Sequence, residues 1–262
     1  MLRMFANSFW FYLPGVVQKK ISRIFAYFFE LKLSRIMILP YCLFFDISSE
    51  YLEQFEPDSG KSYYRSYSDF FQRRYKLSPS ISHSIVWPCE GYVCDWGLFA
   101  EKENSIVKGQ LLKLNDVFAS DIKNEANYFF VNIFLHNHNY HRIHSPIDGR
   151  IKRISHIPGD LVFLRPWFYK ISDVSYPAIR NERVIFEMTD SQDRSWYLAM
   201  VGGFGVGTIQ VSHHVKEGTQ LQVGEEMAKF KLGSTVCLAT PEVFEVKNYL
   251  QPVHVGNASK ET

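Results

Sequence analysis

The sequence predicts an α+β fold that is mainly β, arranged as a compact β sandwich or barrel behind an N-terminal helical region. The first observation is a series of short apolar or alternating runs beyond residue 83, such as YFFVNIFL, ERVIFEM and TVCLAT, separated by Gly, Pro, Asn and Asp. Strands of sandwiches and barrels typically have this length and spacing. The second is residues 1–45, where Phe, Tyr, Leu and Ile are mixed with basic residues. We therefore expect a helical region over residues 1–80 and a β-rich domain over residues 81–262.

Composition narrows the class of protein. The chain has 262 residues, of which 46% are hydrophobic and 21% charged, enough for one sizeable core. Its net charge of only +2 gives no support to nucleic-acid binding. The cysteines lack the paired spacing of a zinc ribbon or a disulfide framework, which indicates reduced thiols in a cytosolic compartment. They are Cys42, Cys89, Cys94 and Cys237.

The N-terminal region predicts an amphipathic helix. Apolar side chains recur between residues 21 and 29 at the i, i+3, i+4, i+7 and i+8 positions, the spacing of one helical face. No apolar run approaches the roughly 20 residues that a membrane-spanning helix needs. The basic residues are interleaved, not placed first as in a signal peptide. Such a helix can lie in the headgroup layer of a membrane; packing of the same face on the protein core is the alternative.

The segment that follows is polar and turn-rich up to about residue 84. Pro57, Gly60 and Pro79 indicate turns within it. Residues 66–76 predict one short helix, with Ser68 or Asp69 as its N-cap.

Two segments of the β-rich part resemble each other. Residues 88–91 (Pro-Cys-Glu-Gly) and 146–149 (Pro-Ile-Asp-Gly) each place an acid and a glycine directly before a predicted strand. An acid–glycine pair indicates a turn, because glycine takes a positive φ at no steric cost. Both segments resemble the paired turns of biotinyl- and lipoyl-carrier sandwiches, and residues 224–235 have the hairpin character of the carrier lysine turn. These likenesses favour a sandwich with two-fold-like halves.

The bond between Gly233 and Ser234 is the strongest local candidate for chemistry. Glycine permits a strained turn and leaves its carbonyl open to attack by the hydroxyl of the next residue. The ester formed by this N→O acyl shift can eliminate to dehydroalanine, which hydrolyses to an N-terminal pyruvoyl group. A Gly-Ser-Thr triplet alone is weak evidence, because ordinary turns often contain it.

Three further sequence blocks make the Gly-Ser-Thr triplet stronger evidence for a reactive site. The chain matches F-F-x-R at residues 70–74 (FFQRR), F-L-x-P-x-D-Y-H-R-x-H-x-P-x-D/N-G at residues 134–149 (FLHNHNYHRIHSPIDG), and N-E-R at residues 180–184 (RNERV). Residues 224–235 (GEEMAKFKLGST) match G-x-E-M-G-x-F followed by Gly-Ser-Thr. In these blocks the chain resembles the phosphatidylserine decarboxylase family. The blocks follow the family's order over most of the chain, so the chain is identified as a member of that family.

The resemblance implies a role for each matching residue. Self-cleavage in the family uses an acid, a histidine and the serine, and the histidine takes the serine hydroxyl proton. Here these are Glu90, His144 and Ser234, with cleavage after Gly233. His141 matches a second family histidine, assigned to the decarboxylation step. An imidazole suits either task because its pKa lies near neutral pH.

Two departures from the family pattern lie in these blocks. The family's aspartate is Glu90 here, and one added methylene moves the carboxylate by about 1 Å, which can cost on the order of 10²-fold in rate. Three outcomes stay open: Glu90 remains within reach of His144, another acid such as Asp148 serves, or processing is slow or absent. The second departure is Asn137 and Asn139 in place of the family's proline and aspartate.

The histidines at 136, 138, 141 and 144 also permit a zinc-cluster interpretation. On a strand the first two would share a face. No carboxylate or thiolate lies at a tight ligand spacing, however, and the last two have roles by resemblance. We therefore expect no metal.

The resemblance implies a cofactor made from the chain itself. A pyruvoyl group derived from Ser234 captures the serine amine of phosphatidylserine and accepts electrons as carbon dioxide leaves. His141 then donates a proton, and phosphatidylethanolamine is released. The mature enzyme would hold a β chain (residues 1–233) and an α chain (residues 234–262).

The implied partners are a phospholipid substrate and a membrane surface, with a peripheral location at the cytoplasmic face of the cell membrane. A homodimer is left open. Two alternatives to the main prediction remain. One is a decarboxylase of the same family that acts on a different amino-acid substrate. The other is a lipid-binding relative that stays unprocessed because the usual aspartate is Glu90.

Overall fold

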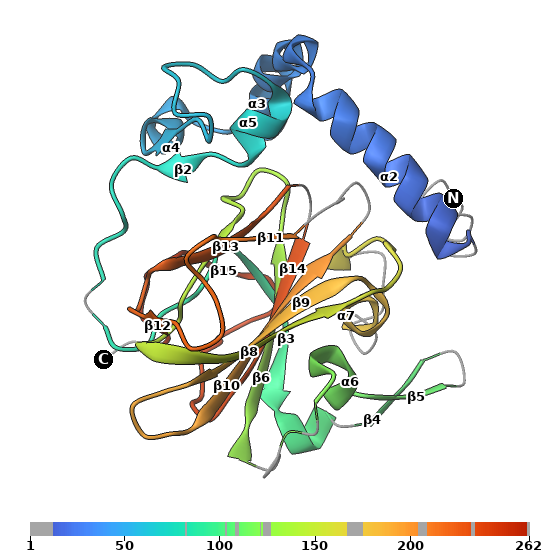
Figure 1. Ribbon diagram of the computed structural model, residues 1–262, viewed down its shortest axis with the longest axis vertical. Coiled ribbons are helices and arrows are strands. Elements are labelled where there is room, and N and C mark those ends of the chain that lie inside the picture. Colours follow the sequence, from blue (N-terminus) through green and yellow to red (C-terminus); the bar gives the residue numbers. More distant parts are fainter. Residues whose placement is uncertain are drawn as a thin grey trace.

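The computed structural model describes residues 13–260 except 82, 103, 108–109, 121, 123–126, 167–174, 204–208 and 232–233. The described part is α+β and mostly β, as predicted. A layer of N-terminal helices lies across one end of a β-rich body, and the β4–β5 ribbon lies toward the opposite end (Figure 1). The largest sheet is open, and none of the sheets in the described ranges closes on itself. The barrel alternative is therefore wrong for this part of the chain.

The N-terminal layer consists of short helices joined by turns. In chain order they are α2 (Gly15–Glu30), the 3₁₀ helix η1 (Lys32–Met37), α3 (Ile38–Phe44), α4 (Ser49–Glu53) and α5 (Tyr67–Phe71). A two-stranded ribbon of β1 (Phe55–Glu56) and β2 (Arg74–Tyr75) connects the layer to the body.

Helix α5 lies where a short helix is predicted, but its cap and its end differ from the prediction. Ser66 is the N-cap, and its hydroxyl accepts a hydrogen bond from the backbone N–H of Asp69 (3.2 Å). Ser68 instead accepts from the Gln72 amide (2.7 Å). The Asp69 carboxylate accepts from the backbone of Ser59 and Arg65. The helix ends at Phe71 because the chain then pairs as β2.

The body is built on an eight-stranded antiparallel sheet with the order β12-β8-β9-β10-β14-β6-β3-β15. Its strands are β3 (Gly91–Leu98), β6 (Phe129–Leu135), β8 (Gly149–Ile157), β9 (Arg183–Thr189), β10 (Ser195–Gly202), β12 (Gln220–Leu221), β14 (Ser234–Thr240) and β15 (Gln251–Val253). A three-stranded sheet has the order β11-β13-β7. Its strands are β7 (Arg142–His144), β11 (Ile209–Val211) and β13 (Glu226–Phe230). The remaining elements are η2 (Phe99–Lys102), β4 (Asn104–Val107), β5 (Gln110–Lys113), α6 (Asn115–Phe118) and α7 (Tyr176–Arg180).

Both faces of the large sheet are covered at its centre. Along β14, Val236 and Leu238 lie in one buried apolar cluster, and Cys237 and Ala239 lie in another. This is the two-residue alternation of a strand. The first cluster also contains side chains of β7 and β13, so the three-stranded sheet packs on that face. The second contains side chains of α6 and α7.

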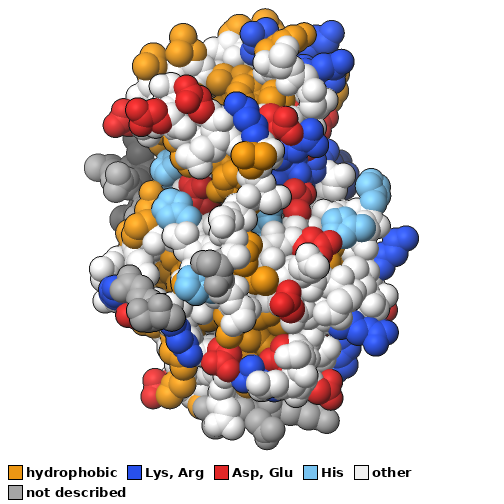
Figure 2. All heavy atoms as spheres, turned by 90° about the vertical axis from the view of Figure 1, so that its left-hand side faces the viewer, with side chains coloured by type: hydrophobic (Ala, Val, Ile, Leu, Met, Phe, Trp, Pro, Cys, Tyr) orange, Lys and Arg blue, Asp and Glu red, His pale blue; other side chains and the backbone are white. Residues whose placement is uncertain are grey.

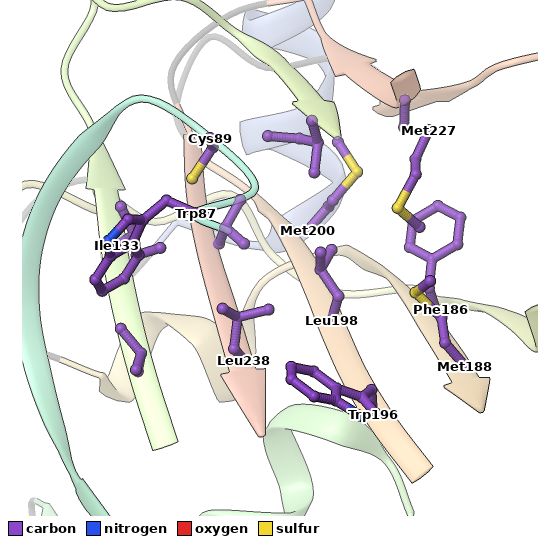
Figure 3. Close-up of a cluster of buried hydrophobic side chains, with 14 of the residues drawn as sticks. Trp87, Cys89, Ile133, Phe186, Met188, Trp196, Leu198, Met200, Met227 and Leu238 are labelled. Carbon is purple, nitrogen blue, oxygen red and sulfur yellow. The ribbon is translucent and has the colours of Figure 1, made fainter. Parts of the chain in front are cut away.

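The first cluster joins side chains from both sheets. Figure 3 shows Leu238 of β14, Leu198 of β10 and Met188 of β9 on neighbouring strands of the large sheet, with Met227 of β13 in the same cluster. Burial of a side chain of this size contributes about 1.5–3 kcal/mol, so this cluster fixes the relative position of the two sheets.

The predicted hairpin over residues 224–235 is wrong. β13 pairs with β7 and β11, whereas β14 pairs with β10 and β6. The two strands are consecutive in the chain but belong to different sheets. Ser234 is the first residue of the large sheet after this change.

The acid–glycine turns do precede strands, but the reason for the glycines is different from the predicted one. Gly91 begins β3 and Gly149 begins β8, and neither has a positive φ. A Cβ at Gly91 would lie 2.6 Å from the carbonyl oxygen of Phe134, and one at Gly149 would lie 2.9 Å from that of Thr189. Glycine is required here because a neighbouring strand approaches closely.

Helix α2 contacts the body through polar side chains. Gln18 and Ser22 are buried, whereas Ile24, Phe25 and Phe28 are 68, 43 and 42% exposed. The Gln18 side-chain oxygen accepts from the backbone N–H of Leu161 (2.8 Å). Much of the apolar stripe therefore faces away from the protein. The helices within the described residues all fall short of the length and hydropathy that crossing a membrane requires.

Candidate active site

The strand register brings the predicted serine and the histidine loop together. Ser234 lies opposite Leu135 of β6 and Gly202 of β10. Leu135 leads directly into the 136–141 loop, which precedes β7. Phe230, at the end of β13, donates its backbone N–H to the carbonyl of His141 (3.0 Å). The end of β6 in the large sheet and the end of β13 in the three-stranded sheet therefore both lie at this loop.

Ser234 is held inside the protein without a hydrogen bond. Its side chain is 0% exposed, and its Oγ has no hydrogen-bond partner among the described residues. A buried polar group left without a partner costs about 1–3 kcal/mol. Its preceding residue, Gly233, lies outside the described residues.

His144 is held at both ring nitrogens. Nδ1 lies 2.7 Å from the carbonyl oxygen of Gly224, and Nε2 lies 3.0 Å from the hydroxyl of Tyr140. A carbonyl oxygen only accepts, so Nδ1 carries the proton and the Tyr140 hydroxyl donates to Nε2. Burial lowers the pKa of His144, although the charge of Glu226 acts in the opposite direction. His144 is therefore a neutral imidazole whose basic nitrogen already receives one hydrogen bond.

His141 has the same tautomer but a free basic nitrogen. Its Nδ1 lies 2.8 Å from the carbonyl oxygen of Asn139, and Nε2 is buried without a hydrogen-bond partner among the described residues. The ring centroid lies 3.9 Å from that of Phe71. Burial lowers the pKa of His141 well below its usual value. The neutral ring therefore presents the lone pair of Nε2 inside the site, while burial disfavours its protonated form.

Glu90 lies in the site but does not contact His144. Its carboxylate accepts hydrogen bonds from the Tyr51 hydroxyl, at 2.9 and 2.8 Å to its two oxygens, and from the Asn139 amide at 2.7 Å. The backbone N–H of His144 donates to the carbonyl of Pro88 (2.8 Å), so the two main chains are close. No hydrogen bond joins Glu90 to His144, because the glutamate side chain turns toward the donors on α4 and the 136–141 loop. The expected direct contact is therefore absent.

A buried arginine completes the surroundings of Glu90. Arg73 is 0% exposed, and its Nη2 donates to the carbonyl of His138 (2.6 Å) and to the Tyr51 hydroxyl (3.2 Å). Its guanidinium also lies over the rings of Tyr51, Phe55 and Phe70, at 5.5, 4.9 and 5.1 Å from their centroids. The Tyr51 hydroxyl thus bridges the buried guanidinium of Arg73 and the buried carboxyl group of Glu90. The Nε atom of Arg73 has no hydrogen-bond partner among the described residues.

Asp148, the other acid considered from the sequence, binds the turn that contains Gly224. Asp148 accepts from the backbone N–H of Val223 (2.7 Å), one residue before the glycine whose carbonyl holds His144. Gly224 has φ +80°, and a Cβ there would lie 2.6 Å from the Ile81 side chain. Asp148 and Gly224 together fix the position of the carbonyl that orients the His144 ring.

Two pockets open beside Glu90, between the N-terminal layer and the body. One, of about 220 Å³, is lined by Phe45, Tyr51, Tyr92 and His138 among others. The second, of about 490 Å³, shares Tyr51 and Glu90. Within the described ranges, no group of three or more His, Cys, Asp or Glu side chains is arranged to hold a metal ion.

Sequence reasoning missed several residues of the site. Tyr140 lies inside the matched Y-H-R block, so the motif contained the signal. Arg73 lies in the F-F-x-R block, which gave no indication of its partners. Tyr51 belongs to no motif, and only the three-dimensional contact with Glu90, 39 residues later in the chain, reveals it.

Comparisons with known proteins agree with the motifs. A sequence model described as phosphatidylserine decarboxylase matches residues 67–259. A phosphatidylserine decarboxylase proenzyme of Methylobacillus flagellatus is 29% identical over 235 residues, which cover 79% of this chain and 81% of the relative. The proenzyme of Geobacillus kaustophilus is 30% identical, covering 83% and 80%. That of Polaromonas naphthalenivorans is 31% identical, covering 71% of each chain.

Proposed function

This chain belongs to the phosphatidylserine decarboxylase family and decarboxylates phosphatidylserine, and we propose that it does so with a pyruvoyl group made from its own Ser234. The observation that carries the proposal is the buried, unpartnered Ser234 hydroxyl at the first residue of β14, beside the histidine loop. The relatives are named proenzymes, which supports a chain that processes itself.

In the proposed self-cleavage, Ser234 Oγ attacks the Gly233 carbonyl carbon. The new C–O bond forms as the C–N bond breaks, and an imidazole moves the hydroxyl proton to the departing nitrogen. We assign this proton transfer to His144, in line with the family pattern. Because Tyr140 already donates to His144 Nε2, that hydroxyl must move aside or pass the proton on. Glu90 contributes through Tyr51 and Asn139 and not by a bond to His144.

When present, the pyruvoyl group supplies the electron-accepting carbonyl that the loss of carbon dioxide needs. The residues present fit such a group, since Ser234 and the free His141 Nε2 lie in a buried site. His141 holds the proton that is delivered to the substrate carbon after carbon dioxide leaves. Because burial favours neutral His141, it must first take that proton before it can donate it.

The proposed products of processing are a β chain of residues 1–233 and an α chain of residues 234–262. β14, the first element of the α chain, pairs with β10 and β6, both in the β chain. These hydrogen bonds support an enzyme whose two chains remain one folded unit.

We propose that the N-terminal layer rests on a membrane surface, peripherally and at the cytoplasmic face. Exposed apolar side chains of α2, η1 and α3 support this proposal. Figure 2 shows hydrophobic side chains at the surface of the end that carries the helical layer. The most exposed are Ile24, Ile36, Leu39, Leu43 and Phe44, at 68 to 81%. Each contributes up to about 1.5–3 kcal/mol when buried in lipid. The four free cysteines suit a reducing compartment.

The proposed likeness of the body to biotinyl- and lipoyl-carrier sandwiches is supported by its two Pro-x-acid-Gly turns. The backbone N–H of Val86 donates to the carbonyl of Pro146 (3.0 Å), and Ile85 forms a β-bridge with Ile147. The segments before β3 and β8 therefore lie side by side, as related halves would.

The two alternatives are separated by one set of experiments. Intact-mass and denaturing-gel analysis of the purified protein should give an α chain that begins with a pyruvoyl group, and Ser234→Ala should give a single full-length band. Decarboxylation of phosphatidylserine in liposomes should exceed that of soluble phosphoserine. A full-length wild-type chain after long incubation would support the unprocessed relative, and a preference for the soluble compound would support the other substrate class.

A further inference from the structure

We propose that Asn139 is a positioning residue that couples the Glu90 carboxylate to the His141 imidazole during decarboxylation. The inference rests on the proposed function, because it assumes that His141 moves a proton in that reaction. It concerns a residue in the loop between β6 and β7 that does not itself touch the reacting atoms.

Asn139 joins three parts of the site. Its side-chain Nδ2 donates to Glu90 Oε1 (2.7 Å), and its side-chain Oδ1 accepts from the backbone N–H of His136 (2.8 Å). Its backbone carbonyl lies 2.8 Å from His141 Nδ1. Its own backbone N–H donates to the carbonyl of His136 (2.8 Å), which closes the turn. The residue is 5% exposed, so water competes little for these contacts.

The Asn139 carbonyl decides which nitrogen of His141 is basic. A carbonyl accepts but cannot donate, so the proton of the neutral ring stays on Nδ1 and Nε2 keeps its lone pair. The direction of this carbonyl depends on how the Asn139 main chain is held. Glu90 holds it through the side-chain amide, and the turn holds it through His136. Glu90 thereby acts on His141 without touching it.

The side chain at 139 must donate to the acid, and a carboxylate could not. With aspartate at this position, two carboxylates would lie within about 3 Å of each other and would share one proton. The chain carries glutamate where the family has aspartate at 90, and asparagine where the family has aspartate at 139. Both departures meet in the single hydrogen bond between Glu90 and Asn139. The longer acid and the amide therefore form a matched pair.

Other titratable and charged groups surround this pair. Tyr51 of α4 donates to Glu90, and Arg73 donates to Tyr51. Others are Cys89, Tyr75, Tyr92, His138 and His254. His138 and His254 line the pocket beside Glu90. The test therefore includes the backgrounds His138→Gln and His254→Gln.

The test compares Asn139→Asp with Asn137→Asp in the full-length, self-processed enzyme. Asn137 lies on the same loop and makes no contact with Glu90 or His141 described above, so it is the matched control. We expect Asn139→Asp to lower kcat on phosphatidylserine liposomes on the order of 10²-fold at pH 7.5, with little change in KM. Activity should recover as the pH falls, because a proton on the pair restores a donor. The same recovery of activity at low pH should occur when Asn139→Asp is combined with His138→Gln or with His254→Gln.

The double variant Glu90→Gln with Asn139→Asp reverses the polarity of the hydrogen bond, since the new amide donates to the new acid. It should regain part of the activity that Asn139→Asp loses at pH 7.5. If Asn139→Asp behaves as Asn137→Asp at every pH, or if its loss is equal at all pH values and the double variant regains nothing, Asn139 has no positioning role.

A second measurement does not depend on enzyme activity, so it remains possible when variants fold or process poorly. In unprocessed Ser234→Ala protein, the ¹⁵N shifts of His141, assigned with His141→Gln, should indicate a proton on Nδ1 at neutral pH. A neutral ring protonated at Nε2 would overturn the proposal. Failure of the proposed function would give a different result. In that case wild-type protein cleaved between Gly233 and Ser234 would release no carbon dioxide from phosphatidylserine.

Discussion

At the scale of single residues, backbone carbonyls orient both histidines of the site. His144 donates to the carbonyl of Gly224, and His141 donates to that of Asn139. Both rings therefore keep the proton on Nδ1 and leave Nε2 as the base. An acid–histidine pair, as the family pattern implies, would need a carboxylate at Nδ1. Here Glu90 binds Asn139, which carries the carbonyl at His141. Asp148 accepts from Val223, the residue before the Gly224 carbonyl at His144.

The carbonyl of Gly224 gives a prediction about processing. Gly224→Ala should slow self-cleavage and lower thermal stability more than Gly218→Ala does. Both glycines have positive φ, at +80° and +88°, so both variants carry a backbone cost of roughly 1–2 kcal/mol. Only at Gly224 would the added methyl lie 2.6 Å from Ile81 and displace the carbonyl that holds His144. Cleavage is followed by denaturing gel and stability by thermal unfolding; equal cleavage rates in the two variants would contradict this role.

The buried histidines predict acid sensitivity. Burial lowers the pKa of His136 to about 4, and it lowers the pKa of His141 and His144 below their usual value. In the unfolded chain a histidine titrates near 6.5, so the unfolded state binds protons first as the pH falls. The free energy of unfolding should therefore decrease as the pH drops from 7 through 6.5 toward 4.

Urea unfolding at pH 7.5, 6 and 5 measures the slope of the free energy of unfolding against pH. The Ser234→Ala protein is used so that the sample does not mix cleaved and uncleaved chains. His136→Gln should make the slope shallower, whereas His156→Gln, at an exposed position of β8, should leave it unchanged. A slope that His136→Gln does not alter would mean that this imidazole is not buried in its neutral form.

The sequence motifs contain most of the candidate site residues but do not reveal their hydrogen-bond partners. Ser234, His141 and His144 lie within matched blocks, and the structure brings their loop and strand together. The partners of Glu90 could not be predicted, because a hydrogen bond to Tyr51 depends on how distant segments pack. For the same reason the sequence left open whether Glu90 reaches His144, and in the structure no hydrogen bond joins them.

At the scale of elements, α2 combines a correct helix prediction with an unusual orientation. Its spacing predicts the helix, and its buried side chains are the polar Gln18 and Ser22. Periodicity identifies an apolar face but does not say what covers it. Phe29 of the apolar stripe packs on Tyr67 of α5. Ile24, Phe25 and Phe28 stay exposed and are left for another surface.

This orientation predicts how the helix binds vesicles. Ile24→Ser with Phe28→Ser should weaken binding to phosphatidylserine-containing liposomes on the order of 10²-fold, because about 3 kcal/mol of apolar burial is lost. Thermal stability should change little, since both side chains are exposed. Val243→Ser, at an exposed apolar position on the body, is the control and should bind as wild type. Flotation measures binding, and equal flotation of the two variants would exclude α2 from the contact.

Strand existence was easier to predict than strand pairing. The run TVCLAT became β14, and its alternating side chains fill both clusters. The two-residue period gives the faces of a strand but not its neighbours. β13 and β14 therefore looked like a hairpin, although their partners lie elsewhere in the chain.

At the scale of the whole molecule, the site lies where the helical layer meets the body. Tyr51 and Arg73 come from the layer, while Glu90 and His138 come from the body. Asp58 is bound by Lys229 at 2.7 and 2.8 Å, and by Arg142, from the three-stranded sheet. A displacement of the layer would therefore reach the acid of the site through direct contacts.

The central position of β14 predicts that the cleaved chains do not separate. β14 is hydrogen-bonded along both edges, to β10 and to β6. The α and β chains should co-elute in size-exclusion chromatography under native conditions and separate only in denaturant. Salt screens the ion pair between Glu242 of the α chain and Arg194 of the β chain (2.6 Å). It should not release the α chain, because the backbone hydrogen bonds along both edges of β14 and the apolar packing remain. Recovery of free α chain from native protein would contradict this pairing.

The pairing of Ser234 has a further consequence for how active enzyme arises. The serine meets the histidine loop only after β14 has been inserted between two strands that come earlier in the chain. A chain that has not folded this far lacks the arrangement needed to make its own prosthetic group. If the proposed processing occurs, the number of pyruvoyl groups in a preparation should not exceed the number of chains that have reached the native topology. The proposed modification would then record successful folding.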